Sequence, residues 1–196
     1  MDQKFGYVCF DVEARGKSKE RNGLIAVGAV VANSDGQVMA RLLWKIQPLQ
    51  GQQMDEKCYN EFWSKNTETL QTLTSGDLWE PTNFAVNFRQ FLDDWDKYFG
   101  GLYLLCDNPA FDAAYIDYYL DKFQLSPMQY DVNGNYRLIH DSDEYARGYL
   151  KTKDQWISSD KVMKDLDLKP FHVDGVPHMP DYDAEKILKF HLALLN

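Results

Sequence analysis

Apolar residues in the first fifty positions follow the period of β-strands. The run Tyr7–Phe10 ends at Asp11, and residues 24–32 and 37–47 predict two further strands. Between these two lies Asn33–Gly36, whose Asp-Gly pair is typical of a hairpin turn. The pattern therefore predicts a three-stranded meander at the start of the chain.

The remainder of the chain alternates between helical and strand patterns. Apolar spacing predicts helices over 54–73 and 82–98, a strand over 102–106, a helix from Pro109 through Tyr119, a strand over 136–139 and a helix over 182–195. The strand over 102–106 is wholly apolar, as expected where both faces of a sheet are covered. We expect an α/β layered domain with a mixed central sheet of about five strands flanked by helices.

Length and composition fit one soluble domain spanning residues 1–196. Apolar residues make up 44% and charged residues 26% of the chain, and no apolar run approaches the ~20 residues of a membrane helix. The first residues lack the pattern of a secretory signal, so we expect an intracellular, soluble protein that does not enter membranes. Cys9, Cys58 and Cys106 form no Cys-x-x-Cys pair, and we expect free thiols.

The net charge of −9 argues against a broad cationic surface that coats a nucleic-acid backbone. It does not exclude a nuclease, because an enzyme that grips a chain end can supply positive charge as bound divalent metal. Clustered metal-binding carboxylates would themselves account for part of the acidic excess.

Three acidic stretches stand at the edges of predicted elements. Asp11 and Glu13 end the first strand and point to the same face, because strand side chains alternate. Asp112 lies in the first turns of the helix after the buried strand. His178 precedes the last helix and Asp183 opens it.

These four carboxylates suit a pair of hard divalent cations. Two Mg²⁺ or Mn²⁺ ions about 4 Å apart need carboxylate oxygens from several sides. A neutral histidine with a pKa of roughly 6.5 is suited to accept a proton from the attacking water. His178 is the candidate general base.

The order Asp-x-Glu, Asn-x-x-Phe-Asp and His-x-x-x-x-Asp-Ala resembles the three motifs of the DEDDh family of 3′–5′ exonucleases. These RNase T-like enzymes belong to the ribonuclease-H-like superfamily, and the match spans residues 11 to 183. The resemblance implies that Asp11, Glu13 and Asp183 bind the nucleophile-activating metal. It further implies that Asp11 and Asp112 hold the second metal and that His178 is catalytic. A tyrosine-type motif would need Tyr at position 179, which is Met.

Four residues, one or two in each motif, depart from the family pattern. Ala14-Arg15 replace the usual Thr-Thr, so that only backbone contacts to the terminal nucleotide can be retained there. Asp107 stands where relatives often carry His, and Pro180 stands where a small residue is usual. None of these changes removes a metal ligand or the general base.

The expected substrate contacts come from six residues: Ala14, Leu24, Phe62, Trp63, Asn108 and Phe111. Phe62, Trp63 and Phe111 offer rings for stacking on a nucleobase, and Leu24 offers apolar surface to the last base. Each has a purely structural alternative, namely packing in a helix or strand core, or helix capping by Asn108. Lys and Arg residues in the loop 16–23 form either a phosphate-binding rim or a solvated loop.

The sequence thus predicts a two-metal 3′–5′ exonuclease that acts on a single-stranded 3′ end of DNA or RNA. Nucleoside 5′-monophosphates are the expected products. The alternatives are an endonuclease of the same superfamily, a catalytically silent module that binds nucleic acid or a partner, and, more distantly, a small-molecule enzyme on another α/β fold. The sequence leaves open whether the chain forms a homodimer.

Overall fold

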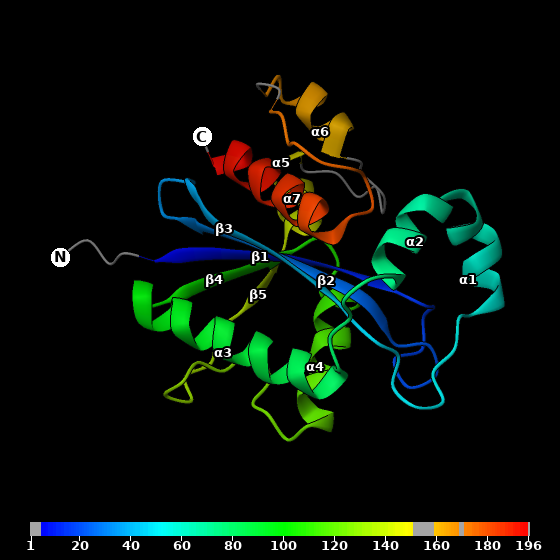
Figure 1. Cartoon of the computed structure of the whole chain (residues 1–196). Coiled ribbons are helices and arrows are strands. Elements are labelled where there is room, and N and C mark those ends of the chain that lie inside the picture. Colours follow the sequence, from blue (N-terminus) through cyan, green and yellow to red (C-terminus); the bar gives the residue numbers. More distant parts are fainter. Residues whose placement is uncertain (1–4, 151–158, 169–170, 196) are drawn as a thin grey trace.

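A mixed five-stranded sheet forms the centre of the computed structural model, which describes residues 5–150, 159–168 and 171–195. The strands are β1 (Gly6–Ala14), β2 (Leu24–Asn33), β3 (Val38–Lys45), β4 (Leu102–Cys106) and β5 (Ile139–Asp141), in the order β3-β2-β1-β4-β5 (Figure 1). Pairing is antiparallel within β1–β2–β3 and parallel within β1–β4–β5. The predicted meander and mixed sheet are confirmed.

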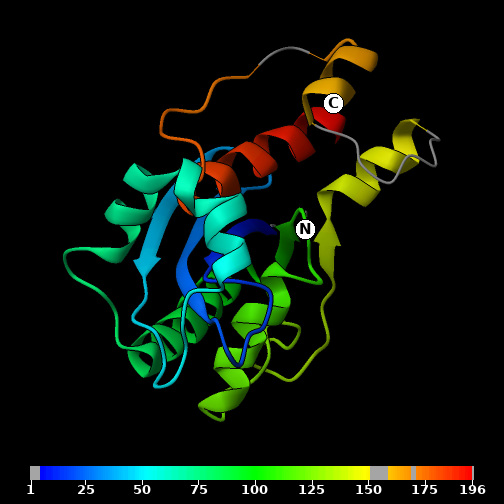
Figure 2. The ribbon, with the colours of Figure 1, turned by 90° about the vertical axis from the view of Figure 1, so that its right-hand side faces the viewer.

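Helices cover both faces of the sheet. They are α1 (Glu56–Glu61), α2 (Thr67–Thr74), α3 (Pro81–Phe99), α4 (Asp112–Lys122), α5 (Ser142–Leu150), α6 (Ser159–Asp165) and α7 (Pro180–Leu195), with a 3₁₀ turn at Trp63–Lys65. Figure 1 shows α7 on one face, α3 and α4 on the other, and α1 and α2 beside the end of the sheet; Figure 2 gives the perpendicular view. The described part of the chain contains no helix long and apolar enough to cross a membrane.

Strand β1 divides its side chains between two cores. Val8, Phe10 and Val12 pack in the core that contains residues of α3 and α4. Tyr7 and Cys9 face the other way and pack with apolar residues of α7. Because side chains alternate along a strand, Asp11 and Glu13 continue the face of β1 that α7 covers.

The single helix predicted over 54–73 is wrong. Asp55 caps α1 by accepting a hydrogen bond of 2.8 Å from the backbone N–H of Cys58, and α1 ends at Glu61. The chain then turns so that the Trp63 indole is fully buried and donates a hydrogen bond of 3.1 Å to the carbonyl oxygen of Ala14. This long-range contact interrupts the helix.

The strand predicted over 136–139 is also misplaced, because β5 begins only at Ile139. Asp131 Oδ1 accepts backbone hydrogen bonds from Asn133 and Asn135, which holds the preceding residues in a turn. The apolar pattern predicted neither α5 nor α6. The three cysteines are free, as expected, with Cys9 and Cys106 buried and Cys58 partly exposed.

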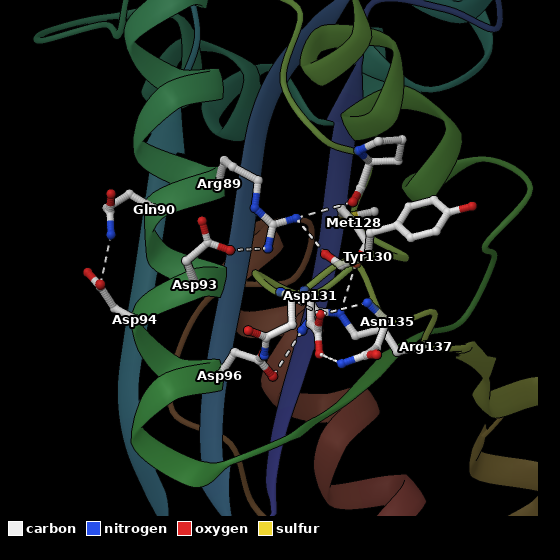
Figure 3. A network of polar contacts seen from close by, with 12 residues as sticks. Arg89, Gln90, Asp93, Asp94, Asp96, Met128, Tyr130, Asp131, Asn135 and Arg137 are labelled. Atoms are coloured by element: carbon white, nitrogen blue, oxygen red, sulfur yellow. Dashed lines mark hydrogen bonds and ion pairs between the residues drawn. The ribbon is translucent and has the colours of Figure 1, made fainter.

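Two arginines tie the segment between α4 and β5 to helix α3 (Figure 3). Arg89 of α3 pairs with Asp93 at 2.6 Å and donates to the carbonyl oxygens of Pro127 and Tyr130. Arg137 pairs with Asp96 of α3 at 3.2 Å and donates to the carbonyl oxygen of Met128. This network holds the segment that leads into β5.

The start of α7 lies directly on Gly28 of β2. A Cβ atom at this position would lie 2.0 Å from the backbone nitrogen of Asp181 and 2.1 Å from the carbonyl carbon of Pro180. Only glycine allows the helix to approach the sheet this closely. The contact sets the height of the His178–Asp183 segment above β1 and β2.

Gly28→Ala is expected to lower stability by about 1–3 kcal/mol, because the backbone of α7 must move away from the sheet. The measurement is thermal or urea unfolding monitored by circular dichroism. Gly101→Ala is the matched control, since a Cβ atom there meets no heavy atom within 4 Å. Equal stability of the two variants would show that the close approach is not required.

Candidate active site

The ends of strands β1 and β4 and the first turns of α4 and α7 converge at one place in the fold. Asp11 and Glu13 come from β1, Asp112 from the first residue of α4 and Asp183 from the first turn of α7. Asp112 is only 3% exposed, and the other three carboxylates are half-buried. The structure therefore brings together the acidic residues that the sequence singled out.

One group of potential metal ligands consists of Glu13, His178 and Asp183. Ligand atoms of these three side chains all lie within 4.8 Å of one another. The carboxylate of Asp183 also accepts a hydrogen bond from the backbone N–H of His178. This contact joins the loop before α7 to the first turn of the helix.

A second group consists of Asp11, Asp107 and Asp112, again with ligand atoms within 4.8 Å of one another. The sequence motifs identify Asp107 only as a departure from the family pattern and do not include it among the site residues. Parallel pairing of Cys9 with Leu105 places Asp107 on the same sheet face as Asp11, two residues further along each strand. The register between β1 and β4 is therefore the feature that identifies Asp107 as part of the acidic site.

Burial and mutual repulsion raise the pKa values of these carboxyl groups. Burial is the main cause at Asp11, where the charges of Asp112 and Glu13 add to it. At Glu13 burial is followed by the charges of Asp183 and Asp112. Burial also raises the pKa of Asp183, although the nearby His178 and Lys186 partly offset this. The site is thus a concentrated region of negative charge.

His178 is held in an uncommon backbone conformation with φ at 63°. The edge of its ring packs against Phe62, with ring centroids 5.0 Å apart and planes at 83°. A left-handed residue outside glycine persists only where surrounding contacts fix it. Here the contacts come from Phe62 on one side and from α7 on the other.

Arg41 of the edge strand β3 fixes the start of α7 from outside the site. Its Nε donates to Asp181 at 2.8 Å, and its Nη1 contacts Glu185 at 3.1 Å and the carbonyl oxygen of Asp174 at 2.9 Å. One guanidinium thereby joins the sheet, the first turns of α7 and the loop before His178. Charge-assisted bonds of this kind restrain orientation more than single neutral ones.

A cavity of about 480 Å³ lies beside the carboxylates, on the α1 side of Glu13. Three of the expected substrate contacts line it: Ala14, Phe62 and Phe111. Cys58 adds to its apolar wall, and Lys17, Arg21 and Lys57 also line it. Asn108 instead lines an acidic cavity of about 380 Å³ that includes Asp11 and Asp112.

Trp63 and Leu24 expose none of their side chains and line neither of these cavities. Trp63 supports the cavity of about 480 Å³ indirectly, because its indole donates a hydrogen bond to the carbonyl oxygen of Ala14 in the cavity wall. Leu24 belongs to the core, and its backbone N–H donates to the hydroxyl of Tyr119. Arg15 is buried too, and its guanidinium donates to the carbonyl oxygens of Leu24 and Ile46.

The donor set fits hard divalent cations. Such ions prefer carboxylate oxygens and leave positions open for water and substrate, whereas a structural zinc site would use Cys and His. The two groups of ligands share the end of β1, because Glu13 belongs to one and Asp11 to the other, which suits a paired site. Asp11, Glu13, Asp112 and Asp183 are the residues that would hold the ions.

Solved structures with the same fold include exonucleases. E. coli exonuclease I in complex with a dT13 oligonucleotide superposes with a TM-score of 0.64 at 13% identity, covering 99% of this chain and 40% of the exonuclease I chain. The chain thus spans less than half of that protein. The nuclease domain of 3′hExo, a DEDDh family member bound to rAMP, gives 0.64 at 16% identity and covers 98% and 92% of the two chains.

A 3′-exonuclease that recognises the histone mRNA stem-loop 3′ end gives a TM-score of 0.65 at 14% identity, with 98% of this chain and 81% of that chain covered. No protein-family model and no curated protein sequence matches the chain. The fold is accordingly that of the DEDDh 3′–5′ exonucleases, a ribonuclease-H-like arrangement, as the sequence motifs predicted.

Asp11→Asn is expected to stabilise the metal-free protein at neutral pH and to abolish stabilisation by Mn²⁺. A carboxyl group with a raised pKa in the folded state contributes stability at low pH that is lost as pH rises toward that folded pKa. Each unit of the shift corresponds to about 1.4 kcal/mol. The advantage of the variant over the wild type should therefore grow from about pH 4 upward.

The measurement is the melting temperature of both proteins in EDTA and in Mn²⁺ between pH 4 and pH 8. Asp121→Asn, on the outer part of α4, serves as the control and should follow the wild type. A wild-type protein whose stability in EDTA matches that of Asp11→Asn at every pH would contradict the electrostatic account.

Proposed function

We propose that this chain is a metal-dependent 3′–5′ exonuclease that hydrolyses the terminal phosphodiester bond of DNA or RNA and releases nucleoside 5′-monophosphates. The observation that carries the proposal is the convergence of Asp11, Glu13, Asp112, Asp183 and His178 at one end of the sheet. It occurs on a fold shared with exonuclease I and the 3′hExo nuclease domain.

The four carboxylates would hold two divalent cations, Mg²⁺ or Mn²⁺, and these would activate water and stabilise the leaving 3′-oxygen. His178 lies beside Glu13 and Asp183, within reach of the same point in the cavity. Its role is to accept the proton of the attacking water.

The cavity beside Glu13 is the proposed site of the terminal nucleotide. Phe62 and Phe111 supply its aromatic surface, and a base can stack on such rings without regard to sequence. Ala14 would bring its backbone close to the sugar, and Asn108 lines the neighbouring acidic cavity. Trp63 and Leu24 take structural roles in this proposal, because neither exposes its side chain.

The bound molecules of the structural neighbours support this substrate class. Exonuclease I has been observed with a dT13 oligonucleotide, and the 3′hExo nuclease domain with rAMP. The aromatic rings of Phe62 and Phe111 in the cavity wall suit the unpaired bases of a single-stranded 3′ end. The acidic character of the site would exclude nucleic acid without bound cations, because phosphates and carboxylates repel.

The wild-type protein is expected to shorten 5′-labelled single-stranded DNA or RNA from the 3′ end in Mg²⁺ or Mn²⁺ and to leave it intact in EDTA. Asp183→Asn should remove the activity, since the variant loses a ligand. His178→Ala should lose about 10²–10⁴-fold in rate while its Mn²⁺-induced rise in melting temperature persists. Gel analysis of the time course measures all three effects.

Controls separate the alternatives. A circular single strand offers no 3′ end, so its cleavage would favour an endonuclease. His172→Ala changes an exposed histidine that pairs with Asp174 outside the carboxylate cluster, and should retain activity. A folded wild-type protein that binds Mn²⁺ and leaves every linear substrate intact would overturn the proposal in favour of a silent binding module.

A further inference from the structure

Lys186 is a cation that the sequence motifs did not single out, and it lies on the wall of the carboxylate site. It follows Asp183 by three residues on α7, so that both side chains share one face of the helix. Together with Asp11, Glu13, His178 and Asp183, it lines a cavity of about 370 Å³. The cavity continues along α7 as far as Phe190.

The Lys186 ammonium has no ion-pair or hydrogen-bond partner among the described residues, although its residue is half-buried. The next lysine on the same helix is different. Lys189 pairs with Glu185 at 2.8 Å and donates to the carbonyl oxygen of His172 at 2.6 Å. Lys189 therefore holds structure together, while Lys186 is left available beside the site.

Apart from Lys186, the charged groups that line this cavity are acidic, so Lys186 is the one Lys or Arg among its described lining residues that could attract an anion. Five carboxylates line the cavity, those of Asp11, Glu13, Asp107, Asp143 and Asp183. A phosphodiester that enters here passes between fixed negative charges. Lys186 supplies a compact positive charge with three donors, which suits one phosphate group.

The positions of the two cavities indicate where the scissile phosphate would lie. Glu13 lines both the cavity proposed for the terminal nucleotide and the cavity of Lys186, so the scissile phosphate lies between them. Lys186 lines the cavity of about 370 Å³ and does not line the cavity proposed for the terminal nucleotide. A nucleic-acid strand with its terminal nucleotide in that cavity would have its upstream part on the side of Lys186.

We propose that Lys186 binds the phosphate one nucleotide upstream of the scissile phosphate and thereby selects substrates that carry this second phosphate. This inference rests on the proposed exonuclease function and adds a substrate contact to it. Lys186 is a binding residue in this role and holds no metal. Its removal changes recognition of one phosphate and leaves the carboxylate site intact.

The test compares two trinucleotides that share the same scissile phosphodiester. In one, the upstream linkage is a phosphodiester; in the other, it is a neutral methylphosphonate. The wild-type kcat/KM is expected to fall about tenfold for the methylphosphonate, as for the loss of one charge-assisted contact. Lys186→Gln should cleave both at the same reduced rate, and Lys186→Arg should recover most of the discrimination.

Lys97→Gln, an exposed lysine on α3, is the matched control and should discriminate as the wild type does. The Mn²⁺-induced rise in melting temperature should be unchanged in Lys186→Gln, which separates a lost phosphate contact from a damaged metal site. Full discrimination retained in Lys186→Gln would overturn the inference while leaving the exonuclease intact. A wild-type protein that cleaves neither trinucleotide nor a longer strand would overturn both.

Discussion

Repulsion among carboxylates that share the half-buried end of β1 is the constraint around which this molecule is arranged. Burial alone raises the pKa values of Asp11, Glu13 and Asp183, and each charge makes the others costlier. The fold offsets part of this cost locally. Asp112 and Asp183 lie in first turns of helices, where the helix dipole favours negative charge, and both accept backbone N–H groups. The remaining excess of negative charge is of the kind that bound divalent cations would neutralise.

Contacts from the cores and from the edge strand hold these groups in place. Gly28 lets α7 approach the sheet, and Arg41 fastens the helix from its outer side. On the opposite side of the site, Trp63 anchors the α1 segment to the backbone of β1 and leaves Phe62 free to contact His178. The contacts that support the cavity walls thus come from the cores and from the edge strand β3.

The sequence was sufficient for the mixed sheet and for the acidic residues at element boundaries, because both follow from local periodicity. It was insufficient where a tertiary contact decides the outcome. The break after α1 depends on an indole that reaches the carbonyl of Ala14, which no pattern within residues 54–73 can reveal. Asp107 joins the site through the register of β1 against β4, and register is a property of paired strands. Lys186 could not be singled out from the sequence, because only the packing of α7 against the sheet brings it beside the carboxylates.

The ligands are spread along the chain, with the first pair in β1 and the last at the start of α7. A ribosome makes the chain from its N-terminus, so β1 through β4 emerge well before His178 and Asp183 exist. A growing chain with the first three carboxylates alone lacks His178, Asp183 and the helix that covers Tyr7 and Cys9. Under the proposed function, hydrolysis would begin only after the segment that carries His178 and Asp183 has left the ribosome and packed on the sheet.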